Sequence, residues 1–194
     1  LSHCPIGKFR EESADAIRAE LKKIEARIDA GDFTYDIALE DIHMHVESAL
    51  IGILGSEGAR VHSGRSRNDQ VALDLRLYVR DEIDTIVAGI KDFQRALVDT
   101  ASNHPETILP GFTHLQHAQV VLFAHHLLAY VEMLERDIAR LEDARKRVNV
   151  MPLGSGALAG STLPLERTIV MEELGFPEVT RNSMDGVSDR DFEI

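Results

Sequence analysis

A glycine- and serine-rich segment carries the first group of residues that could do chemistry. Arg65 and Arg67 stand two residues apart in it, and Asn68 follows directly. If the segment opens a helix, free backbone N–H groups and the helix dipole favour an anion there. Arginine grips a carboxylate through two parallel hydrogen bonds, and an amide can both donate and accept. The pattern predicts a carboxylate site, but a solvated basic loop with Asn68 or Asp69 as helix cap fits it too.

A second polar group follows about forty-five residues later. Thr113, His114 and Gln116 bring a hydroxyl, an imidazole and an amide into one loop. Imidazole titrates near neutral pH, so His114 is suited to proton transfer. A single loop histidine is also common as a surface or capping residue, and the residues alone leave both interpretations open.

Two histidine pairs do not predict a metal site. His43 and His45 are two residues apart, which directs them to different faces of a helix, and His125 and His126 are adjacent. Zinc sites use i, i+4 spacing or several closely spaced ligands, so we expect no metal here. The charged stretch at 188–191, which includes Arg190, taken alone predicts the salt-bridged start of a helix.

The elements that must position these groups are helices. Apolar residues recur every three or four positions in the ranges 12–30, 39–55, 69–102, 119–148 and 164–174. Turn-rich loops at 55–68, 103–111 and 151–160 connect them. The range 69–102 would form a helix roughly 50 Å long.

The two long helices are expected to lie side by side, because their apolar stripes repeat near period 3.5. These stripes are too extensive for two helices to bury, so we expect further helices from outside this chain. If the pair is antiparallel, the loops of Arg67 and His114 lie at opposite ends of one subunit, and a shared site requires symmetry-related subunits. A simple coiled-coil dimer is the alternative, which the polar loops disfavour.

The predicted fold is all-α, a long-helix bundle. We expect residues 1–63 to complete an N-terminal helical domain and residues 64–194 to begin a central long-helix domain. The chain starts without Met and stops at Ile194 with no turn or capping signal. We therefore expect a piece of a longer protein, with natural termini as the alternative.

Composition excludes several classes of protein. Hydrophobic residues make up 44%, charged residues 28% and aromatic residues 5%, which is typical of a helical globular protein. A net charge of −12 disfavours nucleic acid and anionic membranes as partners. No apolar run is long enough to span a membrane. Cys4 is the only cysteine, which excludes an internal disulfide and fits the cytoplasm.

Five segments together resemble the argininosuccinate lyases, a family of the fumarase/aspartase superfamily. They are EDIH at 40–43, GRSRNDQ at 64–70, LPGFTHLQHAQ at 109–119, PLGSGALAG at 152–160 and NSMDGVSDRDF at 182–192. Their order and spacing agree with that family from about residue 9, and GRSRNDQ and DGVSDRDF are the most specific. Val120 in place of Pro and Ser63 in place of Thr are mild departures.

The resemblance implies a β-elimination that splits argininosuccinate into arginine and fumarate without a cofactor. It implies a homotetramer built on a central helix bundle, with each active site formed by three subunits. His114 would take the acid/base role. The substrate-binding residues would be Arg67, Asn68, Thr113, Gln116, His43, Arg65 and Arg190.

Three other functions remain open. The chain could belong to another fumarate-releasing lyase, acting on adenylosuccinate, aspartate or malate. It could also be a non-catalytic homologue resembling δ-crystallin, or a helical interaction module. The family's catalytic serine loop would lie beyond Ile194, so we expect negligible lyase activity from these 194 residues alone.

Overall fold

The computed structural model describes residues 11–193, so Cys4 and the opening eight residues lie outside the described part. The chain divides into two compact units. The first holds residues up to Leu73 together with Met151–Asp189, and the second holds Asp74–Val150 together with the residues from Arg190 onward. The long helix α4 (Arg67–Asn103) begins in the first unit and continues through the second.

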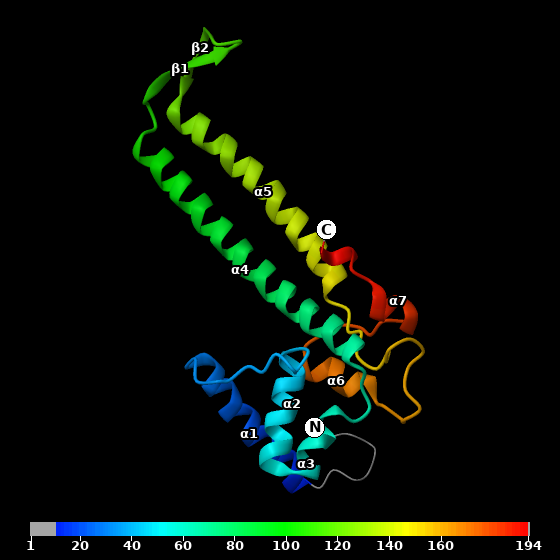
Figure 1. The fold of residues 1–194 in the computed structure, drawn as a ribbon. Helices are drawn as coiled ribbons and strands as arrows, with labels where there is room; N and C mark the ends of the chain where they lie inside the picture. The colour runs from blue at the N-terminus through cyan, green and yellow to red at the C-terminus, as the bar shows by residue number, and fades with distance from the viewer. Residues whose placement is uncertain (1–10, 194) are drawn as a thin grey trace. The chain divides into compact units, whose positions relative to one another are not determined.

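The first unit is built on two packed helices, α1 (Glu11–Asp29) and α2 (Ile42–Leu54) (Figure 1). The apolar stripe of α1 meets α2 through Ile17, Ile24 and Leu50, which are at most 2% exposed. Asp41 caps α2, because its carboxylate accepts the Met44 N–H at 2.7 Å. Both helices lie where the apolar period predicts them.

The range 55–68 was predicted to be a loop, but part of it is helical. It contains α3 (Ser56–Ala59) and the 3-10 turn Arg60–His62. Gly55, with φ +59°, ends α2 and lets the chain turn back. Gly58 then lies directly on α2, since a Cβ at this position would stand 2.4 Å from the Leu50 carbonyl oxygen. The close approach of two backbones explains the short helix that the apolar period misses.

The rest of the first unit is the glycine-rich turn 152–160 with the helices α6 (Arg167–Glu173) and α7 (Ser183–Ser188). The Arg167 guanidinium donates to the carbonyl oxygens of Leu153 at 2.8 Å and Thr180 at 2.9 Å. Burial lowers the pKa of Arg167, while the charge of Asp69 acts against that effect. One arginine thus ties the turn to the segment between the two helices.

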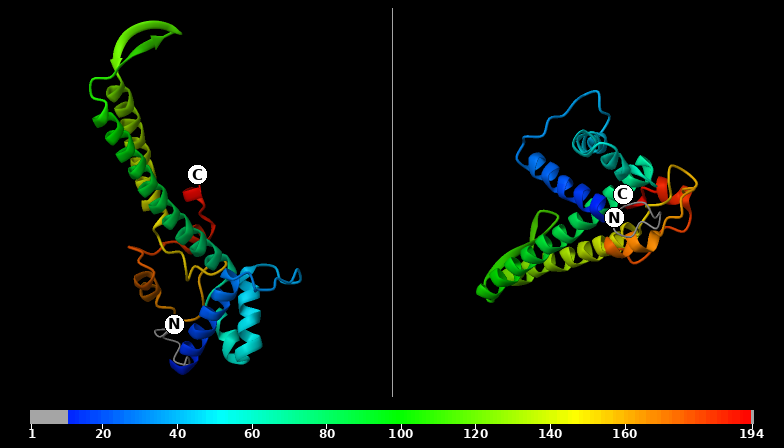
Figure 2. Two further views of the ribbon diagram at one scale, coloured as in Figure 1. Left: turned by 90° about the vertical axis from the view of Figure 1, so that its left-hand side faces the viewer. Right: turned by 90° about the horizontal axis from the view of Figure 1, so that it is seen from below.

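The second unit is an antiparallel pair formed by α4 and α5 (Phe123–Val148), which lie side by side in both views of Figure 2. Arg145 of α5 binds Asp84 of α4 through two hydrogen bonds of 2.6 and 2.8 Å. Near the other end of the pair, the Gln94 amide donates to the Val131 carbonyl at 3.2 Å. One core cluster of this unit contains Ile83, Val148 and Phe192. Phe192 lies in the 3-10 turn Asp191–Glu193.

A β-hairpin connects the two long helices, which corrects the sequence prediction. Strands β1 (Ile108–Thr113) and β2 (Gln116–Leu122) pair antiparallel, so the loop predicted to 111 and the helix predicted from 119 were wrong there. Only His114 and Leu115 lie between the strands, and both have positive φ, 49° and 62°. A two-residue connection with this backbone matches the twist of paired strands.

The long helices leave apolar surface uncovered, as predicted. On α4, Tyr78, Ile86 and Phe93 are 62%, 47% and 54% exposed.

Within residues 11–193, no helix has the length and apolar character needed to cross a membrane.

Candidate active site

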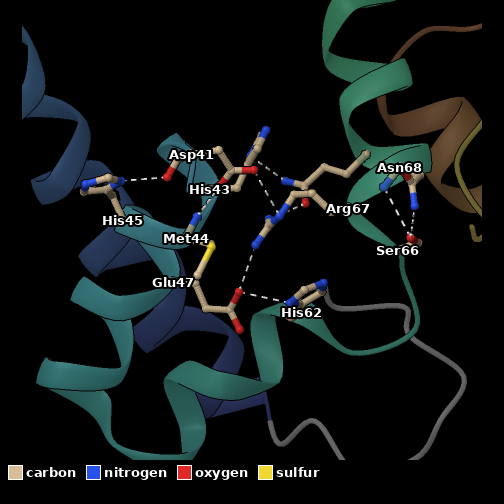
Figure 3. A network of polar contacts seen from close by, with 10 residues as sticks. Asp41, His43, Met44, His45, Glu47, His62, Ser66, Arg67 and Asn68 are labelled. Atoms are coloured by element: carbon tan, nitrogen blue, oxygen red, sulfur yellow. Dashed lines mark hydrogen bonds and ion pairs between the residues drawn. The ribbon is translucent and has the colours of Figure 1, made fainter. Parts of the chain in front are cut away.

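Arg67, the first residue of α4, is the centre of a polar network in the first unit (Figure 3). Its Nη1 donates to the Gln70 side-chain oxygen at 2.9 Å, and its Nη2 donates to Glu47 Oε2 at 3.1 Å. Its Nε lies 3.5 Å from Asp41 Oδ2. The two hydrogen bonds each use one of the two N–H groups on Nη1 and on Nη2.

Helix α2 supplies the other side of this network. His43 and Glu47 stand four residues apart and therefore on one face of the helix. The Gln70 amide nitrogen lies 3.0 Å from His43 Nδ1, and His62 Nδ1 lies 3.0 Å from Glu47 Oε2. Six side chains from three segments are thus joined by direct contacts.

The network borders a cavity of about 310 Å³. Its lining residues are Leu21, His43, Val46, Glu47, Val61, Arg65, Arg67 and Gln70. Both predicted arginines therefore face one space together with His43. The side chains of Arg67 and Glu47 are only 24% and 23% exposed, which strengthens charge interactions in the cavity relative to water.

Asp41 adds a second negative charge beside Arg67. Desolvation by burial acts to raise the pKa of Asp41, but the Met44 N–H and the positive charge of Arg67 outweigh it and lower that pKa below its ordinary value. Asp41 and Glu47 therefore both form ion pairs with Arg67.

The start of α4 is closed by Ser66 rather than by Asn68 or Asp69, the two caps considered from sequence. Ser66 Oγ accepts the Asn68 N–H at 3.2 Å, and Asp69 Oδ1 accepts the Ser66 N–H at 3.0 Å. This is a capping box in which Asp69 takes the place of the usual glutamate. It leaves Asn68 exposed at the mouth of the helix, where its side-chain amide donates to Ser66 Oγ at 3.2 Å.

The second group of predicted residues lies at the tip of the hairpin in the second unit. Thr113 pairs with Gln116 across the turn, and both are exposed, as is His114. Arg67 opens α4 and the hairpin follows its end, so the 37 residues of α4 separate these two segments in the sequence. Arg190 is in the second unit, and its Nε lies 3.1 Å from Glu193 Oε1.

Sequence reasoning missed several members of the network. Glu47, His62 and Gln70 were not predicted as site residues, although Gln70 lies within GRSRNDQ. The spacing of Glu47 from His43, and of Gln70 from Arg67, places each on the same helix face as a predicted residue. That spacing was the available signal. No sequence signal predicted His62, because its position depends on the short helix after α2.

Comparisons of the sequence and the structure with known proteins found matches over most of this chain. A family model described as lyase matches residues 2–194. The argininosuccinate lyase of Pelobacter propionicus is 55% identical over 188 residues, which is 97% of this chain and 41% of that protein. That of Ectopseudomonas mendocina is 54% identical over 189 residues, again 97% of this chain and 41% of that protein. The chain thus spans about two fifths of the length of these curated relatives.

Solved structures share the fold. A variant of EDDS lyase with bound fumarate is 28% identical and has a TM-score of 0.80, covering 93% of this chain and 34% of that chain. A fumarate lyase:delta crystallin from Brucella melitensis has a TM-score of 0.73 at 19% identity, covering 95% of this chain and 45% of that one, and supports the fold alone. The predominantly helical fold and the resemblance found in five segments are confirmed, and the chain belongs to the lyase family.

Proposed function

We propose that the protein containing this chain is an argininosuccinate lyase, which cleaves a carbon–nitrogen bond of argininosuccinate to release arginine and fumarate. The observation that carries the proposal is the 55% identity with the Pelobacter propionicus argininosuccinate lyase over 97% of this chain. The arginine-lined cavity in the first unit supports it, since the substrate carries several carboxylates.

In the proposed reaction, a base removes a proton from the succinyl carbon beside a carboxylate. The carbon–nitrogen bond then breaks, and the guanidino nitrogen that leaves takes up a proton. Negative charge grows on the carboxylate before the bond breaks, so preorganised donors lower the barrier. We assign this task to Arg67 and Asn68, with Arg65 and His43 beside them in or near the cavity.

We assign the acid/base role to His114, with Thr113 and Gln116 as substrate contacts on the same hairpin and Arg190 as a further contact. The exposure of all three hairpin residues supports the proposal that they meet a ligand or another subunit. Because the hairpin and the Arg67 cavity occur in different units of this chain, we propose that neighbouring copies in a homotetramer combine them.

Other features of the whole protein are also proposed. We place it in the cytoplasm and assign it no cofactor, no nucleic acid and no membrane partner. We keep residues 1–63 as the end of an N-terminal domain and residues 64–194 as the first part of a central helical domain. The exposed apolar stripe on α4 supports further helices packed around this central part.

A chimaera tests the proposal. Residues 1–194 replace the matching part of the Pelobacter propionicus relative, and fumarate release is followed by its ultraviolet absorbance. We expect turnover of argininosuccinate and none of adenylosuccinate, aspartate or malate. Turnover of one of those three instead would transfer the assignment to a sister lyase. A folded, inactive tetramer would favour a structural homologue like δ-crystallin.

Two controls sharpen this assay. His114→Asn in the chimaera should lower kcat at least 100-fold, the range expected for a lost acid/base group. The 194 residues alone should show no turnover, because they span about two fifths of the length of the relatives.

A further inference from the structure

His45 is a buried histidine of α2 that contacts two backbone groups of residues 32–41, the connection between α1 and α2. The side chain is only 8% exposed. Its Nε2 accepts the Asp36 N–H at 2.8 Å, and its Nδ1 lies 2.6 Å from the Asp41 carbonyl oxygen (Figure 3). One imidazole thus joins the middle of the connection to the residue that caps α2.

The two backbone groups fix where the ring proton of His45 lies. A backbone N–H can only donate, so Nε2 accepts the Asp36 N–H and carries no proton. A carbonyl oxygen can only accept, so Nδ1 carries the proton and donates it to Asp41. Neither backbone partner can be reversed as a side-chain amide can, so the contacts are consistent with one form of the ring. That form is the neutral Nδ1–H tautomer.

Two aromatic rings of the connection also pack against His45. The ring centres of Phe33 and Tyr35 lie 6.4 and 5.4 Å from that of the imidazole, both in edge contact. Phe33 packs on the apolar core between α1 and α2, but residues 34–38 are all exposed. This part of the connection buries little apolar surface, so its hydrogen bond to His45 is an important anchor.

His45 also acts on the residue that pairs with Arg67. The carbonyl of Asp41 accepts from His45, while its carboxylate accepts the Met44 N–H at 2.7 Å and lies 3.5 Å from Arg67 Nε. Asp41 is therefore held on both sides, by its backbone and by its side chain. The ionisable groups around His45 are Tyr35, Asp36 and Asp41 of the connection, together with Arg27 of α1, whose guanidinium lies 5.5 Å from the centre of the Phe33 ring.

We propose that His45 is a positioning residue, which in its neutral Nδ1–H form anchors the connection 32–41 to α2 and holds Asp41 where its carboxylate pairs with Arg67. A second proton on His45 would set Nε2–H against the Asp36 N–H, two donors facing each other, and the connection would lose this anchor. The role of the positioned Arg67 in binding a carboxylate of argininosuccinate rests on the proposed function. The tautomer rests on the contacts of His45 alone.

Nuclear magnetic resonance of the histidine ring nitrogens tests the tautomer on the 194-residue chain. We expect a pyrrole-type Nδ1 signal and a pyridine-type Nε2 signal, assigned to His45 by their absence in His45→Phe. A ring that exchanges between tautomers would instead give two averaged signals. On acidification, the Asp36 amide signal should shift in the same step in which the His45 ring gains its second proton, and His45→Phe should lack this step. A protonated Nε2 in the neutral ring, or averaged signals, overturns the inference.

Amide hydrogen exchange tests the anchor. His45→Phe keeps an aromatic ring beside Tyr35 but removes both hydrogen bonds, so the Asp36 amide should exchange about 10-fold faster. His45→Gln places an acceptor near the position of Nε2 and should restore most of this protection. His126→Phe is the matched control, because His126 is exposed on α5 and has a similar edge contact with Tyr130, at 5.3 Å. It should leave the Asp36 amide unchanged. Equal exchange in His45→Phe and the parent would show that His45 does not anchor the connection.

The chimaera tests the consequence for catalysis. His45→Phe should lower kcat/KM about 10-fold, mainly by raising KM, because Arg67 is held less firmly in its binding position. His45→Asn keeps a donor near the position of Nδ1 for the Asp41 carbonyl and should retain most of kcat/KM. If the expected tautomer is found but the chimaera has no lyase activity, the proposed function fails and the tautomer assignment stands. If the chimaera is active and His45→Phe is as active as the parent, the positioning role fails and the lyase assignment stands.

Discussion

The carboxylate of Asp69 accepts the backbone N–H of Gly156 at 2.8 Å, across 87 residues of sequence. The same oxygen accepts the Gly154 N–H at 2.9 Å, and the other oxygen accepts the Ser66 N–H. Asp69 is fully buried, and Gly156 has φ +66° with no room for a Cβ, which would stand 2.4 Å from the Gly160 carbonyl oxygen. One carboxylate therefore joins the turn before α4 to the glycine-rich turn 152–160.

Asp69→Asn should destabilise this junction. An asparagine amide has one oxygen, so its NH₂ group must face either the Ser66 N–H or the two glycine N–H groups. Loss of charge-assisted bonds and a buried donor pair together cost about 3 kcal/mol. We expect the amides of Gly154 and Gly156 to exchange with solvent about 100-fold faster, the factor that corresponds to this energy.

Asp137→Asn is the matched control for this change. Asp137 is 52% exposed on α5, and among residues 11–193 its ion-pair partner is Arg140, three residues away. An exposed pair of this kind contributes at most about 1 kcal/mol, so the glycine amides should keep their exchange rates. Unchanged exchange in Asp69→Asn would show that this carboxylate does not hold the glycine-rich turn.

Periodicity predicts the helices of this chain well and its long-range polar contacts poorly. The stripes through Ile17 and Ile24, and through Ile83, indicate helices because burial repeats every three or four residues. The two arginines of the 64–70 segment were chosen by residue type, and the structure places both at one cavity, while their role as an anion site stays a prediction. No local pattern indicates that Asp69 bonds to Gly156, or that Glu47 bonds to Arg67, because such partners are chosen by the tertiary fold.

The hairpin shows how a periodic pattern can mislead. Residues 119–122 continue the apolar rhythm of α5, so a helix through them was expected. Pairing of Ile108 with Leu122 and a two-residue turn make a strand instead. The usual turn signal is Asn-Gly, and His114 and Leu115 occupy the two positive-φ positions without it.

Leu115→Gly should therefore stabilise the hairpin. Leu115 has φ 62° and is 92% exposed, so its side chain contributes strain at the turn and little packing in this chain. Removing the Cβ relieves about 1 kcal/mol of left-handed backbone strain. Leu115→Val should make the hairpin less stable than in the parent, because a branched Cβ is harder to accommodate at positive φ. Amide exchange across β1 and β2 measures both changes. Val120 lies on a strand with ordinary φ, so Val120→Gly should destabilise the hairpin, whereas Leu115→Gly stabilises it.

The pair Asp84–Arg145 should make the second unit weakly sensitive to acid. The hydrogen bonds that Arg145 donates lower the pKa of Asp84 below its ordinary value, although desolvation acts to raise it. A carboxyl with a lowered folded pKa stabilises the fold above its unfolded pKa of about 3.9 and loses that contribution as pH falls through the folded value. Because both side chains are more than a third exposed, we expect under about 1 kcal/mol.

A double-mutant cycle measures this contribution. Asp84→Asn and Arg145→Met, alone and together, give the coupling energy from urea unfolding of the second unit's helices. We expect a positive coupling at pH 7 that is lost as pH falls through the lowered folded pKa of Asp84. A coupling that persists at low pH would mean that packing, and not charge, joins these two side chains.

Arg76→Met should destabilise the second unit far more than loss of an exposed charge. Arg76 is 1% exposed, and its Nη1 donates to the carbonyl oxygens of Arg147 at 2.9 Å and Val148 at 3.1 Å. The last carbonyls of a helix have no partner within it, and a positive charge there also complements the dipole of α5. The guanidinium also lies 4.2 Å from the centre of the Phe192 ring. Losing these contacts costs about 3 kcal/mol.

Urea unfolding, followed by circular dichroism, separates the loss of these Arg76 contacts from a general effect of removing a charge. Arg76→Lys keeps the charge without the flat group over Phe192, so its loss of stability should be intermediate. Arg140→Met removes a cation that is 71% exposed on α5 and should change stability by no more than about 0.5 kcal/mol. If Arg76→Met and Arg140→Met were equally mild, the carbonyl oxygens at the end of α5 would not depend on Arg76. The last turn of the helix would then be held by the packing of Val148 and Phe192 alone.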